Sequence, residues 1–272
     1  MPVSDTEILP SGHAHPGDLV RIGSTVRRPV GSYTPAVHAY LRHLEKVGFE
    51  GSPRVHGIDS EGREVLDFIP GDVPHSPLPA WAGTDGALAS LARLLRRLHD
   101  AAASFSPPPE AVWHEPQPPM TYAGTRVCHN DLVPDNVVFR DGQAVAFIDF
   151  DLSAPVDPIW DVAVAIRHWL PVRAEPDLER AHLDREPGPR LALFCDAYGL
   201  SAHDRSRLLD AVLECTRYAH DYVQMKAAAG ERAWIRAMAE GRCERHLRSS
   251  HWLTSNRQEL QSWLRSGSEP RA

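Results

Sequence analysis

A short central segment of the chain combines carboxylates and an amide at a spacing suited to chemistry on phosphate groups. Residues 129–136 read His-Asn-Asp-Leu-Val-Pro-Asp-Asn, and an Ile-Asp-Phe-Asp sequence follows at 148–151. Asn136 and Asp149 offer an amide oxygen and a carboxylate, which are the oxygen ligands that Mg²⁺ prefers when it also binds phosphates and water. Asp131, on the same loop, remains available as a general base. This set of residues predicts phosphoryl transfer from a nucleoside triphosphate.

The residues between Asn136 and Asp149 predict a β-hairpin that brings the two ligands together. Two β-rich runs flank an Asp-Gly dipeptide at 141–142, which is typical of a two-residue turn. Counting back from this turn places Asn136 opposite Phe147 and puts Asn136 and Asp149 on one face, about 7–8 Å apart at the backbone. One cation could bind between them. The alternative is that the Asp-rich loop consists of turn formers that cap their own backbone.

The motifs in this segment resemble those of the aminoglycoside phosphotransferase family of small-molecule kinases, within the protein-kinase-like superfamily. The matching motifs are His129-x-Asp131-x4-Asn136, Ile148-Asp149-Phe150-Asp151 and Asp157-Pro158-x2-Asp161. The resemblance implies an α+β fold of two lobes. Residues 1–70 would form a small nucleotide-binding lobe with an antiparallel β-sheet and one helix, and residues 71–272 a larger, mainly helical lobe that binds substrate and carries out catalysis.

The resemblance also implies roles for individual residues. Asp131 would orient and deprotonate the acceptor hydroxyl, while Asn136 and Asp149 would hold Mg²⁺, with Asp151 as a further metal candidate. His129 and Asp161 would support the catalytic loop. The phosphoryl donor would be ATP or GTP.

Nucleotide contacts are expected from the N-terminal strands. Alternating residues at 18–28 predict two strands with a turn at 23–24, and the loop at 12–17 would lie over the phosphates. Arg27 or Arg28 stands where the family places a phosphate-pairing lysine, and strand alternation favours Arg27; alternatively, both arginines only solvate a strand end. The resemblance implies that backbone groups of Asp67, Phe68 and Ile69, before a hinge at 70–71, face the purine.

One feature departs from the family pattern. The helix expected at 35–47 normally carries a glutamate that pairs with the lysine, but Val37 and His38 occupy the corresponding positions and the first acid is Glu45. An arginine without a carboxylate partner is the main sequence evidence for an inactive relative.

Helical periodicity predicts the elements of the larger lobe. The helix at 84–103 has a leucine stripe and Thr84 as a possible cap. Further helices are expected after the hairpin, at residues 160–170, 189–198, 203–228 and 231–264.

The spacing of the motifs favours a small acceptor over a peptide. Only residues 152–160 separate the Asp149 motif from Asp161, which is too short for the segment with which protein kinases hold a peptide. Candidate substrate contacts in the helical lobe are Asp157, Glu214, Tyr218 and Asp221. A charged stripe of this kind is equally typical of a solvated helix face.

Composition bounds the partners. The net charge of −7 and the lack of a dense basic cluster disfavour nucleic-acid binding, and no stretch approaches the length of a membrane span. Four widely spaced cysteines predict reduced core residues, and the N-terminal sequence predicts a cytoplasmic protein. A monomer or homodimer is expected.

Two functions fit these observations. The first is an ATP- or GTP-dependent O-phosphotransferase acting on a small hydroxylated compound, such as an aminoglycoside-type or other antibiotic, or on a sugar or amino-alcohol metabolite. The second is a kinase-like binding or immunity protein that turns over poorly.

Overall fold

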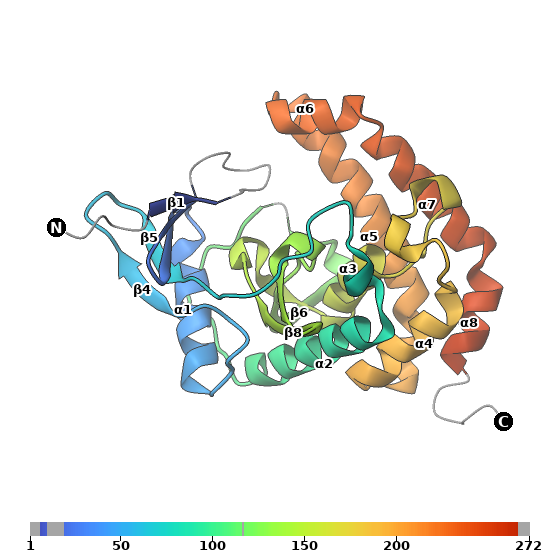
Figure 1. Ribbon diagram of the computed structural model, residues 1–272, viewed down its shortest axis with the longest axis horizontal. Coiled ribbons are helices and arrows are strands. Elements are labelled where there is room, and N and C mark those ends of the chain that lie inside the picture. The colour runs from blue at the N-terminus through green and yellow to red at the C-terminus, as the bar shows by residue number, and fades with distance from the viewer. Residues whose placement is uncertain (1–5, 10–18, 116, 266–272) are drawn as a thin grey trace.

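The computed structural model describes residues 6–9, 19–115 and 117–265. An antiparallel sheet with one helix forms the N-terminal part, and helices dominate the C-terminal part (Figure 1). The α+β class and kinase-like fold predicted from the motifs are confirmed. The loop at 12–17, expected over the phosphates, lies outside the described residues.

The N-terminal sheet has the strand order β1-β2-β3-β5-β4, with antiparallel neighbours throughout. The strands are β1 (Thr6–Ile8), β2 (Val20–Ile22), β3 (Thr25–Arg28), β4 (Val55–Ile58) and β5 (Glu64–Asp67). Helix α1 (Thr34–Lys46) has a proline in its first turn, where the missing N–H costs nothing. Its stripe of Val37, Tyr40, Leu41 and Leu44 is buried, and it joins the common hydrophobic core of the protein.

The connection out of β5 contacts the catalytic hairpin directly. Asp72 forms an isolated bridge with Phe139, in which each backbone N–H donates to the partner's carbonyl at 2.8 Å. Gly71 precedes it with φ +155°, and a Cβ at this position would lie 2.5 Å from the Phe139 carbonyl oxygen. Only glycine allows this close approach of the two chain segments.

Two small antiparallel pairs form the centre of the molecule. Strand β6 (Ala123–Cys128) pairs with β9 (Ala154–Val156), and β7 (Val137–Arg140) pairs with β8 (Gln143–Phe147). The Asp141-Gly142 turn is present, with φ values of +50° and +70°. The predicted register is wrong beyond the turn, however, because a bulge in β8 places Val137, not Asn136, opposite Phe147.

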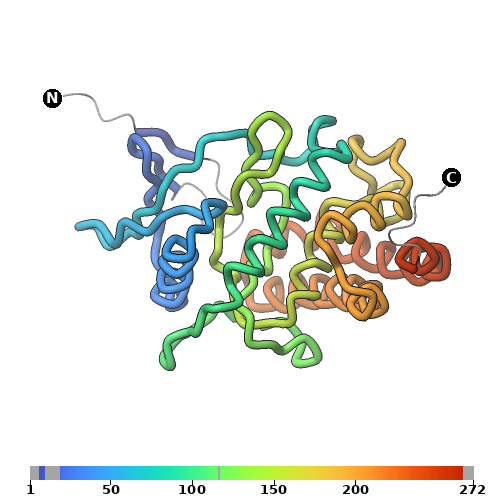
Figure 2. The backbone as a smooth tube through the Cα atoms, turned by 90° about the horizontal axis from the view of Figure 1, so that it is seen from below, coloured from blue at the N-terminus to red at the C-terminus, as the bar shows by residue number. Residues whose placement is uncertain are grey.

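Helix α2 (Asp85–Ala102) lies between the N-terminal sheet on one side and the C-terminal helices on the other (Figures 1 and 2). Thr84 caps it by accepting a hydrogen bond from the Ala87 N–H, as predicted. Its leucines at positions 88, 91, 94, 95 and 98 are fully buried, and each contributes roughly 1.5–3 kcal/mol of hydrophobic stabilisation.

The remaining helices complete the C-terminal part. They are α3 (Pro158–Trp169), α4 (Pro187–Tyr198), α5 (Ala202–Ala228), α6 (Arg232–Ala239), α7 (Arg242–Ser255) and α8 (Arg257–Arg265). The single helix expected at 231–264 is wrong, because Gly241 in the left-handed region and a break at Asn256 divide it into three. In the described part of the chain, none of the helices has the length and apolarity that crossing a membrane requires.

Candidate active site

Helix α3 supports the catalytic loop, which comprises residues 129–136. Asp161, which is completely buried, accepts hydrogen bonds from the backbone N–H groups of His129 and Asn130, both at 2.9 Å. Burial alone would raise the pKa of Asp161, but these bonds and His99 hold it below its usual value. Asn130 takes a left-handed φ of +65°. This strained turn is therefore fixed by a charged group.

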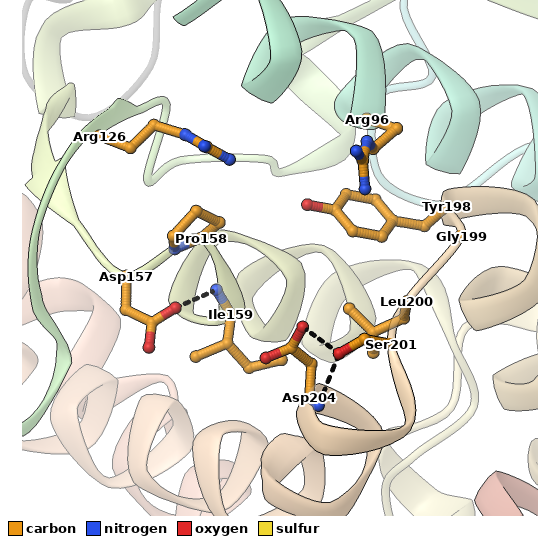
Figure 3. A pocket seen from close by; sticks show the side chains of 10 residues that line it. All are labelled: Arg96, Arg126, Asp157, Pro158, Ile159, Tyr198, Gly199, Leu200, Ser201 and Asp204. Carbon is orange, nitrogen blue, oxygen red and sulfur yellow. Dashed lines mark hydrogen bonds between the residues drawn. The ribbon is translucent and has the colours of Figure 1, made fainter. Parts of the chain in front are cut away.

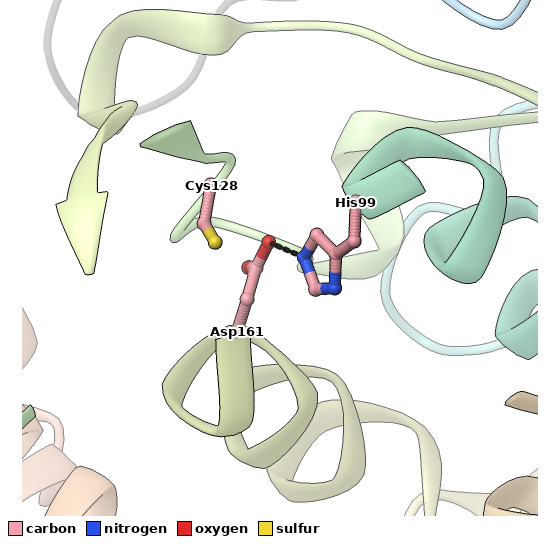
Figure 4. Close-up of side chains that lie close together, drawn as sticks. All are labelled: His99, Cys128 and Asp161. Carbon is pink, nitrogen blue, oxygen red and sulfur yellow. Dashed lines mark hydrogen bonds and ion pairs between the residues drawn. The ribbon is translucent and has the colours of Figure 1, made fainter. Parts of the chain in front are cut away.

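His99, Cys128 and Asp161 lie close enough together for their ligand atoms to share a metal ion (Figure 4). The hydrogen bonds favour a different explanation. His99 contacts Asp161 through Nε2 at 3.0 Å and Tyr198 through Nδ1 at 2.7 Å, so both of its nitrogens are occupied. Burial raises the pKa of the Cys128 thiol well above its usual value, which keeps it neutral. The group is a support for the catalytic loop.

Asp131 is the central carboxylate of the site. The Asn136 side-chain N–H donates to its Oδ2 and to its backbone carbonyl, both at 2.9 Å. Its own backbone N–H donates to His129 Nδ1 at 3.3 Å, so the His129 proton resides on Nε2, which donates to the Ile148 carbonyl. Burial, followed by the charge of Asp149, raises the pKa of Asp131 to about 7. A carboxylate with this pKa can exchange a proton near neutral pH.

Asp149 and Asp151 lie at the end of the hairpin and face Arg28. Asp149 has a left-handed φ of +62°, a conformation that non-glycine residues adopt mainly where the surrounding structure enforces it. Arg28 donates to Asp149 Oδ1 at 2.9 Å and to Asp151 Oδ1 at 2.5 Å. Tyr33 donates to the other Asp151 oxygen at 2.9 Å. Burial raises the pKa of Asp151 to about 6 even though Arg28 opposes the shift.

Arg28 also has the carboxylate partner that the sequence did not reveal. Glu64, opposite it on β5, accepts from Arg28 Nε at 2.6 Å and contacts His38 Nε2 at 2.8 Å. Although burial lowers the pKa of Arg28, the three neighbouring carboxylates hold it above its usual value. The glutamate missing from helix α1 is therefore replaced by a strand glutamate, which His38 links to that helix.

The structure separates the two arginines that the sequence left open. Arg27 donates to Thr25 Oγ1 on its own strand, whereas Arg28 reaches the acids of the hairpin. Before residues 70–71, where a hinge is expected, the backbone N–H groups of Asp67 and Phe68 donate to the carbonyls of Arg54 and Ser24. Ile69 lies two residues beyond the end of β5.

The expected substrate residues each have partners within the helical part. Asp157 caps α3, binds Arg207 at 2.6 Å and lines a cavity of ≈ 170 Å³ that includes no residue of the catalytic loop (Figure 3). Glu214 pairs with Arg217 at 3.6 Å, and Asp221 is 77% exposed beside His220. Tyr218 packs between Trp160 and Tyr222.

Further residues surround the site, of which sequence reasoning missed Tyr33 and His114. Tyr33 bridges Asp151 and the ring of His114, whose centroid lies 5.3 Å away. Tyr222 lies close enough to Asp131 for the carboxylate to add to the effect of burial in raising the pKa of the phenol. Tyr222 follows Tyr218 by four residues on α5, and this helical spacing places the two aromatic side chains on one face of the helix.

The fold and these contacts define the class as a protein-kinase-like phosphotransferase, and comparisons with known proteins agree. The model of the phosphotransferase enzyme family (APH) matches residues 110–195. The trifolitoxin immunity protein of Rhizobium leguminosarum bv. trifolii is 34% identical over 261 residues, covering 90% of this chain and 94% of that protein. The chain belongs to the phosphotransferase enzyme family, a group of small-molecule kinases.

Solved structures share the fold at low sequence identity. The GDP complex of aminoglycoside 2'-phosphotransferase-IIIa superposes with a TM-score of 0.62 at 14% identity, covering 94% of both chains. A choline/ethanolamine kinase family protein from Mesorhizobium loti gives a TM-score of 0.61 at 18% identity, covering 92% of this chain and 89% of that one.

Proposed function

We propose that the protein transfers the γ-phosphoryl group of ATP or GTP to a hydroxyl of a small molecule, with an antibiotic or toxic compound as the favoured acceptor. One observation carries the proposal. Asp131 is partly buried and held by Asn136, on a loop that Asp161 supports, and its pKa of about 7 suits proton transfer at neutral pH.

Asp131 acts as the base in this proposal. Its carboxylate accepts the proton of the acceptor hydroxyl as that oxygen attacks the γ-phosphorus, and the bond to the nucleoside diphosphate breaks. The Asn136 N–H holds the carboxylate in position through Oδ2. Because phosphoryl transfer needs little covalent help, positioning and charge neutralisation supply most of the catalysis.

The donor set fits a Mg²⁺ ion bound with the nucleotide. Asn136 donates twice through its amide nitrogen, which leaves its oxygen as a ligand, and Arg28 contacts one of the two Asp149 oxygens. Asp149, Asn136 and Asp151 would hold the ion, which would neutralise charge on the triphosphate.

Arg28 would serve the nucleotide in place of the family's lysine. Its guanidinium already lies between the two hairpin acids, and it can donate to phosphate oxygens in a bidentate manner. Arg27 donates to Thr25 of its own strand and would contribute only its charge. The proposed backbone contacts to the purine are Ile69 and the carbonyls of Asp67 and Phe68. The protein would act in the cytoplasm as a monomer or homodimer.

A second candidate is protection of the cell by binding alone. The 34% identical relative is called an immunity protein, and it matches this chain over nearly its full length. In this case the protein would retain a toxic compound with little turnover. Asp157, Glu214, Tyr218 and Asp221 would then matter as surface contacts on the helical part, as would the aromatic neighbours of Tyr218.

Mass spectrometry separates the two candidates. The purified protein is incubated with MgATP or MgGTP and a panel of antibiotics, amino-sugars, sugars and amino-alcohols. A product heavier by one phosphoryl group, absent with Asp131→Asn, supports the enzyme. Unmodified compounds together with tight, nucleotide-independent binding of one of them would favour sequestration.

A further inference from the structure

A second arginine, Arg167, is partly buried on the last turn of α3 beside the catalytic loop. The same turn contacts that loop through the Trp169 indole N–H, which donates to the Leu132 carbonyl at 2.8 Å. Arg167 and Asp131 influence each other electrostatically, since the guanidinium opposes the upward shift of the Asp131 pKa. Arg167 therefore sits on the acceptor side of the proposed base, away from the residues that face the nucleotide.

The partners of Arg167 are unusual for a partly buried cation. Its two terminal nitrogens donate to His168 Nε2 and His246 Nε2, both at 2.8 Å. Across residues 6–9, 19–115 and 117–265, no carboxylate lies within ion-pair distance of it. Burial and the neighbouring arginine lower the pKa of His168 well below its usual value and that of His246 to about 2. Both imidazoles are neutral acceptors, so they orient the guanidinium without cancelling its charge.

Further cations surround this group. Arg173 donates to the Arg167 carbonyl at 2.5 Å, and Arg242 and Arg245 approach from α7. We call Arg167, Arg173, Arg242 and Arg245 the cation cluster. Burial lowers the pKa of Arg167, Arg173 and Arg242, and mutual repulsion lowers those of Arg173 and Arg242 further, although the charges of Glu179 and Asp177 near Arg173 and of Glu240 near Arg242 oppose the shift. The chain as a whole has a net charge of −7, so this local excess of positive charge is not a consequence of composition.

Such an arrangement costs folding free energy unless an anion completes it. A buried charge is normally paired, because desolvation is unfavourable and only a close opposite charge offsets it. Arg167 uses two of its five N–H groups on the imidazoles, which leaves donors for a ligand. His246 Nδ1 is likewise buried without a partner in the described residues. The cation is oriented in advance for a group that the folded chain does not itself supply.

Aromatic side chains connect the cation cluster with the base. Tyr222, near Asp131, packs against Trp234 of α6 with ring centroids 5.1 Å apart. The guanidinium of Arg242 lies 5.8 Å from the Trp234 centroid. An acceptor that spans from Asp131 to Arg167 would therefore contact the aromatic rings of Tyr222 and Trp234 and several cations. A polycationic acceptor would be repelled at this position.

We propose that the acceptor hydroxyl belongs to a compound with a negatively charged group, a carboxylate or a phosphate, that binds Arg167 while the hydroxyl reaches Asp131. This inference rests on the proposed phosphotransferase function and specifies its substrate class. A charged hydrogen bond to an anion changes specificity by about 10- to 100-fold relative to a neutral analogue.

The test compares acceptors that differ only in charge. Phosphorylation by MgATP is followed for gluconate against gluconamide, N-acetylserine against its amide, glucose 6-phosphate against glucose, and for kanamycin as a polycation. The wild type should favour the anionic member of at least one pair by about 10-fold or more in kcat/KM. Arg167→Gln should abolish that preference while the nucleotide KM is unchanged. A preference for kanamycin or the neutral members, or an equal loss for both members of a pair, would overturn the proposal.

A binding measurement separates failure of this inference from failure of the proposed function. Thermal unfolding is followed in sulfate and in chloride at matched ionic strength, with sulfate as the anion probe. Sulfate should stabilise the wild type and the matched control Arg93→Met, an exposed α2 arginine, more than Arg167→Gln and Arg167→Met. If no acceptor is phosphorylated yet this difference persists, the anion site stands and the enzyme proposal fails. Equal sulfate effects in all four proteins would overturn the anion site.

Discussion

Two partly buried arginines near the catalytic base have opposite surroundings. Arg28, at the end of β3, contacts the carboxylates of Glu64, Asp149 and Asp151. Arg167, on α3, contacts two imidazoles and lies among other arginines. The pKa of Arg28 is raised by its acids and that of Arg167 is lowered by burial.

The difference shows how one site can prepare for two ligands. On the nucleotide side, Arg28 pairs with Asp149 and Asp151, which would otherwise repel one another. These ion pairs would persist until Mg²⁺ and phosphates bind. On the acceptor side, Arg167 donates to neutral imidazoles and has no carboxylate within ion-pair distance among the described residues, so that a ligand can supply a close counter-charge. The first region is stable in itself, whereas the second is stabilised by binding.

The largest effect is expected at Asp131, between the surroundings of Arg28 and those of Arg167. Asp131→Asn should lower kcat by about 10²–10⁴-fold because the hydroxyl loses its proton acceptor, while nucleotide affinity stays nearly unchanged. Steady-state rates and calorimetric titration of MgATP provide the two readouts. Unchanged turnover would remove Asp131 from the role of base.

The second prediction tests the contrast in stability. Arg28→Met should lower the free energy of unfolding by about 3–5 kcal/mol, because it leaves Glu64 buried without its cation. Arg167→Met should cost far less and could raise stability, since it removes an unpaired charge. Urea denaturation compares the two variants with the wild type. Adding Glu64→Gln to Arg28→Met should recover part of the loss, and failure to do so would contradict the assigned pairing.

A third variant shows how a buried charge behaves when hydrogen bonds alone compensate it. Asp161→Asn should lower the free energy of unfolding by about 1–3 kcal/mol, because an amide cannot accept from His129, Asn130 and His99 as a carboxylate does. The catalytic loop would loosen, so kcat should fall more than nucleotide affinity. A variant with full kcat would show that the loop holds its shape without this residue.

The smallest effect concerns pH. The folded state holds the pKa of His246 at about 2, below its usual value of 6.5, so the unfolded chain takes up this proton first as the pH falls. Stability associated with His246 is therefore present above pH 6.5 and declines below it. His246→Gln should unfold at a temperature that depends less steeply on pH between 6.5 and 5. Parallel pH profiles would contradict a neutral imidazole at this position.

Several elements were predictable because their signals are local. The Asp141-Gly142 turn, the Thr84 cap and the leucine stripe of α2 depend on neighbouring residues and appear as expected. The register of the hairpin was not, because a bulge in β8 shifts pairing by one residue without a distinct sequence signature. Likewise, Gly241 alone did not indicate that residues 231–264 form three helices instead of one.

The sequence by itself determined the class of fold and the catalytic motifs, because His129, Asp131, Asn136 and Asp149 lie within one short segment with local geometry. Only the tertiary structure decided which arginine serves the acids, that Glu64 of β5 replaces a helix glutamate, and that Arg167 approaches Asp131. These contacts join residues distant in the chain. Their charges are matched or left unmatched by packing, which spacing along the sequence does not encode.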